Sequence, residues 1–413
     1  MSCTHAVVLL RGDDSAGGSK YPMMLQEVLF KSLLRWMSDA LCKVGGHSLC
    51  VVRADKSLDD LLLSCFSPHL TDIVMLDANS PAVKRDVLSY LSGGTDNALF
   101  VSSPALLTAR ALESLCLASS GNFLTELLTE DEQSTGTYCF SSANAEALFS
   151  HLDKRFDLAT VKPSLQSEHL SLGQCFVPNG CAARVQNPTE LNMIRRALQN
   201  AIVDRHMHQG VSILDPSNVT ISSEAVIGRD TTLLPGVIIR GHTVIGEDCE
   251  IGPFAVLSDC VLGDRCTVNA SQIYDSKMGS DVKVGPYAYV RPGCVLGNQI
   301  KIGDFVELKN AQIGSHTKIP HLSYVGDTDV GTSVNIGCGS ITANYDGRKK
   351  HRTKIDDGAF IGCGSTMIAP VTIGQNAYTA AGSTLTRDVP SGALGIARAR
   401  QANKEGWVEK NKK

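Results

Sequence analysis

Aliphatic side chains recur at every sixth position over most of the second half of the chain. Many are followed directly by glycine, as in VIGED, KIGDF and FIGCG. A period of six with an aliphatic and then a small residue is typical of a parallel β-helix, with three hexapeptide sides to a coil. Glycine suits the corner because the backbone there adopts conformations that a β-carbon disfavours. The first run is Ile227, Leu233, Ile239, Ile245, Ile251 and Leu257, and after a one-residue slip it continues at Leu262 and Val268. Later runs are Val284, Val290, Leu296, Ile302 and Leu308, and then Ile355, Ile361, Met367, Ile373 and Leu385. We expect residues 211–390 to form this β-helix.

The first half of the chain has a different pattern. Short apolar runs alternate with segments of helical periodicity, such as residues 24–41. This alternation predicts an α/β domain over residues 1–186 with a mainly parallel sheet. The apolar runs cover residues 6–10, 48–52, 72–76 and 98–101.

Residues 187–210 carry the signals of a linker helix. Asn187 is a suitable N-cap, Pro188 fits the first helical position and Glu190 completes a capping box. Gly210 is a stop signal. The last segment, residues 391–413, is expected to be a tail.

The hexad register breaks once over a long stretch. Ile336 and Ile355 are 19 positions apart, and the sequence SITANYDGRKKHRTK lies between them. This stretch is too polar and too basic for the wall of a β-helix, so we predict an external loop. Its basic residues are Arg348, Lys349, Lys350, His351, Arg352 and Lys354.

Length and charge limit the classes of partner. A chain of 413 residues exceeds what one hydrophobic core usually supports, which favours two folding units. The net charge of −4 and pI near 6.3 give no overall attraction to nucleic acid or to an anionic membrane. We expect neither as a partner.

The cysteines and the N-terminus indicate a cytoplasmic protein. The 14 cysteines are scattered and form no CxxC motif, so we expect reduced thiols in small core positions. The first residues contain only a five-residue apolar run without a basic lead-in. Neither a secretory signal nor a membrane anchor is expected there.

Residues able to do chemistry gather between positions 291 and 354. Arginine and lysine suit a phosphate, asparagine and tyrosine suit sugar hydroxyls or amides, and histidine is a candidate general base. The residues are Arg291, Lys309, His321, Tyr324, Asn335, Asn344 and Tyr345. Taken one at a time, each has a structural explanation: Arg291 can project into solvent, and Lys309 can pair with Glu307 at the surface. Their clustering favours a site.

A zinc site is the competing interpretation. His316 and His321 form an H-x4-H pair, and some hexapeptide β-helix enzymes hold zinc with three histidines. The third ligand would lie about two coils upstream, where Ser280 stands. We therefore expect no metal site.

An ordered set of motifs resembles one enzyme family. RPGCVLG, FVELKNAQIG, HLSYVGDTDVG, VNIGCGSITANYDG, IAPVTIG, GSTLTRDVP and KEGW are similar to the acetyltransferase half of the bacterial bifunctional N-acetylglucosamine-1-phosphate uridylyltransferase / glucosamine-1-phosphate N-acetyltransferase. The resemblance implies a left-handed parallel β-helix and a homotrimer with sites at the subunit interfaces. It also implies acetyl-CoA-dependent N-acetylation of glucosamine 1-phosphate, in the biosynthesis of UDP-N-acetylglucosamine for peptidoglycan and lipopolysaccharide.

The same resemblance assigns roles to residues. His321 matches the catalytic base. Four positions match contacts to the sugar phosphate: Arg291, Lys309, Tyr324 and Asn335. Six match contacts to acetyl-CoA: Cys338, Asn344, Tyr345, Cys363, Ala381 and Arg398. At two of them, Cys338 and Cys363, the family more often has alanine and serine.

The resemblance weakens in the N-terminal half. For this half it implies a shortened α/β domain of the Rossmann-like nucleotidyltransferase type. Residues 7–25 keep the strand, Gly12 and Pro22 of the phosphate-binding loop, but its Thr-Arg pair is missing and Met23 replaces the lysine. The segment that reads uracil has no counterpart, the nearest stretch being residues 76–86.

The magnesium ligands of that half are also replaced. Ser102 and Ser103 stand where the family has an aspartate, and Gln186, next to Asn187, stands for its asparagine. Phosphoryl transfer relies on a cation and charge clamps. We predict an acetyltransferase whose first domain is inactive or nearly so. The alternatives are the full bifunctional enzyme, which needs Mg²⁺, and a non-catalytic β-helix that binds the sugar nucleotide.

Overall fold

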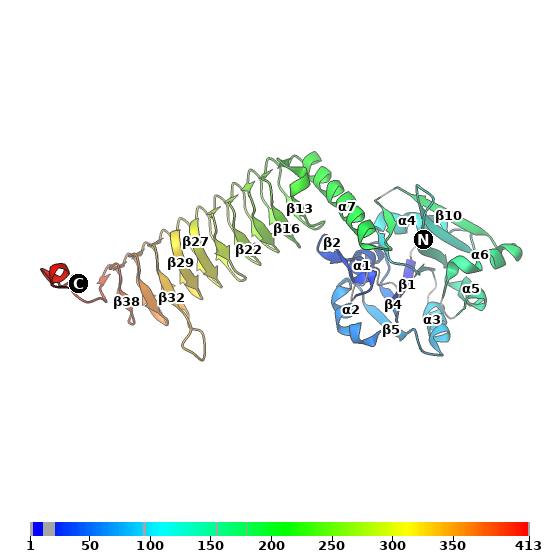
Figure 1. Cartoon of the computed structure of the whole chain (residues 1–413), viewed down its shortest axis with the longest axis horizontal. Coiled ribbons are helices and arrows are strands. Elements are labelled where there is room, and N and C mark those ends of the chain that lie inside the picture. Colours follow the sequence, from blue (N-terminus) through cyan, green and yellow to red (C-terminus); the bar gives the residue numbers. More distant parts are fainter. Residues whose placement is uncertain (1–2, 11–20, 94–95, 154–155, 179, 412–413) are drawn as a thin grey trace. The chain divides into compact units, whose positions relative to one another are not determined.

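The computed structural model describes residues 3–10, 21–93, 96–153, 156–178 and 180–411 (Figure 1). The chain divides into two compact units, Met1–Gln199 and Asn200–Lys413. The predicted α/β and β-helix classes are both confirmed. No helix among the described residues is long and apolar enough to cross a membrane.

The first unit is built on a seven-stranded sheet in the order β10-β8-β9-β6-β1-β4-β5. The four predicted apolar runs form the adjacent parallel strands β6, β1, β4 and β5, while β9 is antiparallel to both of its neighbours. The strands are β1 (Cys3–Leu10), β4 (Ser48–Arg53), β5 (Asp72–Asp77), β6 (Asn97–Val101), β8 (Leu124–Thr129), β9 (Ser134–Ser141) and β10 (Leu172–Val177). Two small pairs accompany them: β2 (Glu27–Val28) with β3 (Lys31–Ser32), and β7 (Ala105–Leu107) with β11 (Ala182–Arg184).

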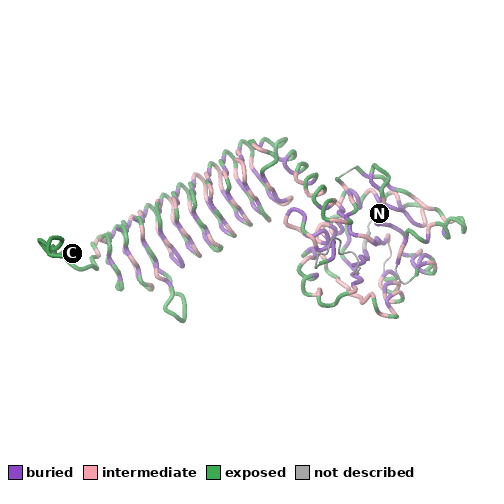
Figure 2. Tube along the Cα trace, viewed as in Figure 1, coloured by how far each residue is buried: buried purple, intermediate pink, exposed green. Residues whose placement is uncertain are grey.

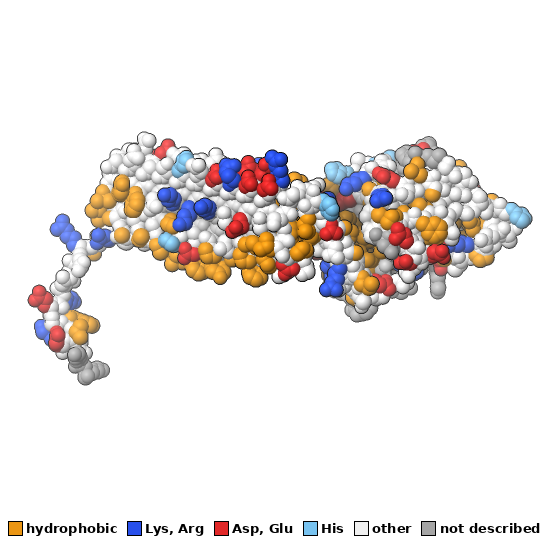
Figure 3. Space-filling view, turned by 90° about the horizontal axis from the view of Figure 1, so that it is seen from above, with side chains coloured by type: hydrophobic (Ala, Val, Ile, Leu, Met, Phe, Trp, Pro, Cys, Tyr) orange, Lys and Arg blue, Asp and Glu red, His pale blue; other side chains and the backbone are white. Residues whose placement is uncertain are grey.

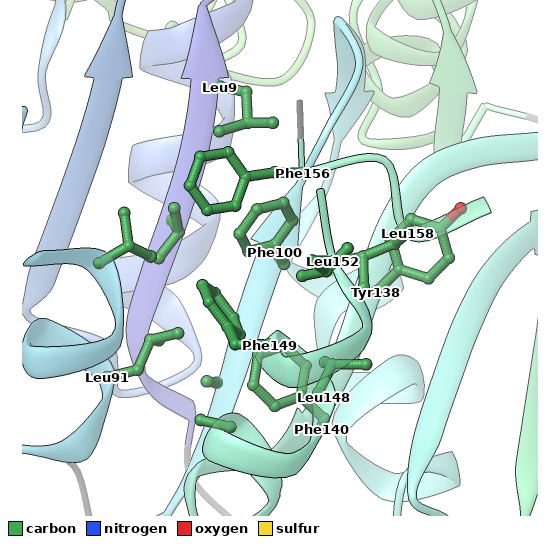
Figure 4. Packing of buried hydrophobic residues seen from close by; sticks show 14 of the residues in the cluster. Leu9, Leu91, Phe100, Tyr138, Phe140, Leu148, Phe149, Leu152, Phe156 and Leu158 are labelled. Carbon is green, nitrogen blue, oxygen red and sulfur yellow. The ribbon is translucent and has the colours of Figure 1, made fainter. Parts of the chain in front are cut away.

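Helices cover this sheet and close its core. The helices are α1 (Leu33–Lys43), α2 (Asp59–Cys65), α3 (Val83–Ser92), α4 (Ala109–Ala118), α5 (Ala145–His151) and α6 (Leu158–Ser167). In one core cluster Phe100, Phe149 and Phe156 meet with ring centroids about 6 Å apart (Figure 4). Such contacts add to the burial of apolar area that stabilises the unit.

The helical periodicity over residues 24–41 is only partly expressed. Helix α1 begins at Leu33, because the side chain of Ser32 caps it by accepting from the backbone of Arg35. Upstream, Leu29 and Phe30 have positive φ and form the turn between β2 and β3. Sequence periodicity did not reveal this hairpin.

The linker helix forms as α7 (Pro188–His208). The side chain of Asn187 accepts from the backbone N–H of Glu190 at 2.9 Å, and the Glu190 carboxylate accepts from the backbone N–H of Gln186 at 2.7 Å. The first bond is half of the predicted capping box. In the second, the carboxylate reaches the amide of the residue before the cap, Gln186, instead of that of Asn187. Gly210 follows the helix with a φ of +93°.

The second unit is a parallel β-helix with three faces, here named A, B and C. Face A contains β12 (Ser212–Ile213), β15 (Thr232–Leu233), β18 (Glu250–Ile251), β21 (Thr267–Val268), β24 (Lys283–Val284), β31 (Asn335–Ile336), β34 (Phe360–Ile361), β37 (Tyr378–Thr379) and β39 (Leu394–Gly395). Face B contains β13 (Thr220–Ile221), β16 (Ile238–Arg240), β19 (Val256–Ser258), β22 (Gln272–Tyr274), β25 (Tyr289–Val290), β32 (Ile341–Ala343), β35 (Thr366–Ile368) and β38 (Thr384–Leu385). Two long strands, β27 (Lys301–Lys309) and β29 (Lys318–Gly326), bend from face A into face B.

Face C is a separate sheet of nine short strands. They are β14 (Val226–Ile227), β17 (Val244–Ile245), β20 (Val261–Leu262), β23 (Lys277–Met278), β26 (Val295–Leu296), β28 (Gln312–Ile313), β30 (Thr328–Val330), β33 (Thr353–Ile355) and β36 (Val371–Ile373). Strand pairing on face A continues to β39, and a short helix, α8 (Trp407–Asn411), follows.

Each predicted inward aliphatic is buried, and the residue before it is more exposed (Figure 2). The alternation follows from the pleat, which points successive side chains to opposite sides of a strand. Figure 3 shows exposed apolar side chains gathered along one border of this unit, and acidic and basic side chains next to each other elsewhere.

The predicted external loop is present between β32 and β33. Asn335 pairs with Phe360, a separation of 25 residues, whereas Thr232 pairs with Glu250 at the 18 residues expected for three hexads. The loop leaves the coil after Ala343 (Figure 1). An isolated bridge joins Tyr345 to Lys350.

Candidate active site

On face B, outward-facing residues of successive coils stack into two parallel columns, one that contains Glu307 and one that contains Lys309. Strand alternation places residues i and i+2 on the same side, so Glu307 and Lys309 project together from β27. Arg291 lies beside Lys309 on the preceding coil, and Gly326 pairs with Lys309 on the following one. A β-carbon at Gly326 would lie 2.4 Å from the hydroxyl of Tyr324. The Tyr324 ring therefore occupies the space that a side chain at position 326 would need.

Three cations meet over this array. Arg291 donates to Glu307 at 2.9 Å, which raises the pKa of Arg291 and leaves Glu307 bound to arginine rather than to Lys309. The ammonium of Lys350, from the external loop, lies against Lys309 and lowers its pKa. We call Arg291, Lys309 and Lys350 the cation cluster. An anion between these side chains would relieve their mutual repulsion.

The external loop is fastened to the coil through Asp327. This buried carboxylate accepts hydrogen bonds from Asn310 at 2.7 Å and from Asn344, the first residue after β32. Burial acts to raise the pKa of Asp327, but these bonds and the charges of Lys309 and Lys350 lower it overall. An ionised Asp327 thus holds the start of the loop and draws Lys350 toward Lys309.

His321 lies on β29 before the corner at Leu322, where φ is +33°. Its Nδ1 is 2.7 Å from Oδ1 of Asp304, its partner on β27, and the contact lowers the pKa of Asp304. With the proton on Nδ1, the imidazole donates to the carboxylate and Nε2 remains free to accept a proton. The imidazole is exposed, so Nε2 is accessible to a ligand.

The coils that follow continue the line from His321 in one column. The backbone N–H of Gly339 donates to Leu322 O at 2.7 Å, which sets Cys338 beside His321. Gly364 donates to Cys338 O at 2.7 Å and Gly382 to Cys363 O at 2.8 Å, which continues the register. We call this line the base column. It consists of Asp304, His321, Cys338, Cys363 and Ala381.

The neighbouring corner changes character immediately after His321. Earlier coils carry exposed Tyr287 and Phe305, stacked at 5.7 Å, and then Leu322. Later coils have glycine at the same corner, and a β-carbon at Gly382 would meet nothing closer than Cδ of Arg398 at 3.8 Å. The bare backbone beside Cys338, Cys363 and Ala381 leaves room for an unbranched ligand chain that runs toward Arg398.

The structure separates the sequence-predicted site residues into two groups and leaves one residue, Asn335, apart from both. Arg291, Lys309, Tyr324 and Asn344 lie on face B or at the start of the loop, and Tyr345 is exposed on the loop. His321, Cys338, Cys363 and Ala381 lie along the base column, and the side chain of Arg398 lies beside its end, near Gly382. Asn335 is on face A, where it lines a shallow groove with His316 and Lys318.

Sequence reasoning missed three residues of this site. The sequence shows Lys350 only as one of a run of basic residues, and such a run is a signal for an anion site. Asp304 and Asp327 gave no signal by spacing alone, since each meets its partner 17 positions along the chain on the next coil.

The family model of the GMPPB C-terminal domain matches residues 215–319 of the chain. The bifunctional protein GlmU of Brevibacillus brevis is 36% identical over 452 aligned positions, covering 99% of this chain and 98% of that protein. The chain belongs to the GlmU family. The motif resemblance is thereby confirmed.

Other relatives match the chain in part. The GlmU of a Geobacillus species is 45% identical over 285 positions, which span 68% of this chain and 62% of that protein. Among solved structures, an Arabidopsis UDP-N-acetylglucosamine acyltransferase aligns with a TM-score of 0.31 and 18% identity, over 46% of this chain and 71% of that one.

The first unit does not present the donor set that magnesium prefers at the positions where the GlmU family resemblance implies it. Ser102 is buried and donates to Gly136 O at 3.0 Å. The side chain of Asn187 is used by the helix cap, and Gln186 lines a pocket that also contains Arg184. Hard cations select carboxylate oxygens, and an arginine repels them. The described residues contain no group of three or more His, Cys, Asp or Glu placed to hold a metal ion.

The phosphate-binding loop implied for this unit falls largely outside the described residues, since Gly12 lies in the segment 11–20. Two of its later positions are described. Pro22 precedes a short 3₁₀ turn, Met23–Leu25, in which Met23 is buried. At the lysine position the structure therefore has a core side chain.

Proposed function

We propose that the chain transfers the acetyl group of acetyl-CoA to the amino group of glucosamine 1-phosphate in the cytoplasm, in the biosynthesis of UDP-N-acetylglucosamine. The observation that carries the proposal is the 2.7 Å contact between His321 and Asp304, in a column that continues along bare backbone. The cation cluster lies one corner away. Membership in the GlmU family supports the same reaction class.

His321 acts as the general base. Its Nε2 takes a proton from the C2 ammonium of the sugar, and the freed amine attacks the thioester carbonyl. The tetrahedral intermediate then collapses to the amide: the C–S bond breaks, the nitrogen gives up a second proton, and CoA leaves as its thiol. Asp304 keeps the other nitrogen protonated and stabilises the imidazolium that forms. The amides of Gly337 and Gly339 already donate to carbonyls, so the amide of Cys338 is the candidate donor to the tetrahedral oxyanion.

The cation cluster binds the phosphate of the sugar. Arg291, Lys309 and Lys350 supply donors on one side, and Tyr324 stands beside them with its hydroxyl 3.5 Å from the Asn344 amide. Charge-assisted hydrogen bonds to phosphate are roughly twice as strong as neutral ones. Asn335 would complete the sugar contacts from face A.

Acetyl-CoA follows the base column. Cys338, Cys363 and Ala381 are small enough to let the pantetheine arm lie on the backbone, with Arg398 near its end. Asn344 and Tyr345 belong to the other group, around the corner at Leu322. This separation within one chain supports a homotrimer in which neighbouring subunits combine the two groups into one site.

For the first domain we propose little or no uridylyl transfer, because Ser102, Gln186 and Met23 replace the chemistry that it needs. The alternative is the complete bifunctional enzyme, and the match over 99% of the chain to a relative named bifunctional favours it. Release of pyrophosphate from UTP and N-acetylglucosamine 1-phosphate, with and without Mg²⁺, distinguishes the two. Robust Mg²⁺-dependent turnover would overturn the proposed loss.

The acetyl-transfer test measures the N-acetylated product by mass spectrometry. A thiol reagent that detects released CoA would be unsuitable, because it would also react with the exposed cysteines of the protein. Glucosamine 1-phosphate should be acetylated faster than glucosamine or glucosamine 6-phosphate. Binding of these ligands without any product would instead support the non-catalytic β-helix. Unchanged turnover in His321→Ala would refute the base assignment.

A further inference from the structure

Two exposed thiols lie on consecutive coils immediately after His321. The bond from Gly364 N–H to Cys338 O fixes Cys338 and Cys363 in register. Neighbouring strands lie about 4.8 Å apart, which falls within the Cα separation of a disulfide. Both thiols are free and exposed, whereas every other cysteine with a described side chain is buried or intermediate. The pair is therefore the most accessible thiol site in the described part of the chain.

We propose that Cys338 and Cys363 form a site at which low-molecular-weight disulfides oxidise the two protein thiols. Oxidation of these thiols switches off acetyl transfer. The inference rests on the proposed function for its effect on activity, but not for the reaction at the thiols. CoA disulfide is the ligand that suits this location best, since the base column is where the CoA arm is proposed to lie.

The chemistry balances without a further oxidant. The Cys338 thiolate attacks one sulfur of the disulfide, forming a mixed disulfide and expelling one CoA thiolate. The Cys363 thiolate then attacks the protein sulfur of that mixed disulfide and expels the second CoA. The protein is oxidised: it loses two hydrogens and gains one S–S bond. The small disulfide is reduced by these two hydrogens to two thiols.

The position of the two cysteines directly opposite each other on neighbouring coils makes a Cys338–Cys363 disulfide labile. Side chains directly opposite on neighbouring parallel strands start about 4.8 Å apart, slightly beyond the usual Cβ separation of a disulfide of about 3.5–4.5 Å. Closing the bridge strains the coil, and strained, exposed disulfides are easily reduced. In a reducing compartment such a bond acts as a reversible switch rather than as a structural staple.

Oxidation would affect catalysis directly. Cys338 is the next residue in the column after His321, and Cys363 lies between Cys338 and Ala381. A disulfide there draws the two coils together and removes the flat strip along which the CoA arm would lie. A mixed disulfide would fill the same strip with a CoA moiety.

The experiment treats the full-length protein with CoA disulfide and then measures intact mass and acetyl transfer. The intact mass of the wild-type protein should fall by two hydrogens and its rate of acetyl transfer should fall at least tenfold. Dithiothreitol should restore both the mass and the rate. Tryptic peptides 319–348 and 355–387 each contain one of the two cysteines, so their cross-link is diagnostic. In Cys363→Ala, which lacks the resolving thiol, a stable CoA adduct should accumulate on Cys338.

The β-helix supplies a matched internal control. Cys249 and Cys266 also occupy consecutive coils, with the backbone of Cys266 donating to the Cys249 sulfur at 3.3 Å, but both are buried. They should remain unlinked under the same treatment. Equal oxidation of both pairs, or no change in mass at Cys338 and Cys363, would overturn the proposal.

Acetyl-CoA separates this inference from the proposed function. Protection of the thiols by acetyl-CoA would support both. Cross-linking that acetyl-CoA does not slow would leave the modification site standing and contradict the proposed path of the CoA arm. Cross-linking with undiminished acetyl transfer would refute the switch.

Discussion

Nδ1 of His321 lies 2.7 Å from Oδ1 of Asp304, on adjacent coils of the β-helix. The bond orients an otherwise exposed imidazole and fixes which nitrogen faces the substrate.

The His321–Asp304 pair should behave as a base and its positioning residue. His321→Ala should lower kcat by about 10²- to 10⁴-fold, the usual contribution of a general base. Asp304→Asn keeps the size of the side chain but loses its charge, so kcat should fall by a smaller factor with KM nearly unchanged. Steady-state kinetics on the purified variants provides the measurement.

The control for this pair is Asp281→Asn, which removes an exposed carboxylate bound to Arg265 elsewhere on the β-helix. Its kcat should match that of wild type. An Asp304→Asn variant as active as Asp281→Asn would show that the contact with His321 has no role in the reaction.

Lys350 should act through substrate affinity. Lys350→Gln removes one charge-assisted contact to the phosphate, so KM for glucosamine 1-phosphate should rise about tenfold, equivalent to about 1.4 kcal/mol. Lys349→Gln, one residue earlier on the same loop, is the matched control and should leave KM almost unchanged. Equal effects of the two substitutions would mean that only the overall charge of the loop matters.

The same substitution should change the titration of Lys309. The neighbouring ammonium of Lys350 lowers the pKa of Lys309, so its removal should raise that pKa toward the ordinary lysine value. An NMR titration of the lysine side chains, with Lys309→Arg to assign the signal, measures this shift. A pKa of Lys309 that does not move would contradict the contact.

Asp327 should make the stability of the loop depend on pH in the acid range. Burial opposes its ionisation, yet hydrogen bonds from Asn310 and Asn344 lower its pKa in the folded protein. A lowered carboxylate pKa gives stability that is present above the unfolded value of about 3.9 and is lost as pH falls through the folded value.

Asp327→Asn should therefore destabilise the β-helix at neutral pH by about 1–3 kcal/mol, the cost of a broken buried hydrogen-bond network. The difference from wild type should shrink below about pH 4. Chemical denaturation at several pH values measures it, and Asp329→Asn, an exposed carboxylate paired with Arg352, serves as the control. A difference that stays constant with pH would contradict the assignment.

Gly326→Ala should displace Tyr324 with little effect on folding. The new methyl group would lie 2.4 Å from the tyrosine hydroxyl, so the ring must move away from the cation cluster. We expect KM for the sugar phosphate to rise severalfold and thermal stability to change little, because the far end of a side chain moves more easily than backbone.

A double-substitution cycle tests this interpretation. In a Tyr324→Ala background, Gly326→Ala should add almost nothing, since the ring that it displaces is already absent. Fully additive effects would show that Gly326 acts through the backbone instead.

The sequence predicted the β-helix well because its signal is local and repeated. Each inward aliphatic, from Ile227 to Leu385, must be buried once per hexad, so the period can be read without knowledge of any contact. The cap at Asn187 and the loop after Ala343 were also predictable, the first from side-chain chemistry and the second from a break in the period. The hairpin before α1 was missed because its residues have helical periodicity while the turn depends on the positive φ of Leu29 and Phe30.

The site was predicted as a set of residues but not as an arrangement. The motifs identified His321, Lys309 and Cys338 by position, and only the stacking of coils showed which of them are neighbours. Asp304 reaches His321 and Asp327 reaches Asn344 over 17 positions each, a distance at which no local pattern links two residues. By itself, the sequence determined the coil, its loop and the chemical groups available, because side-chain burial repeats along the chain. The tertiary structure decided which groups meet, because contacts between coils depend on register and on the corner at Leu322.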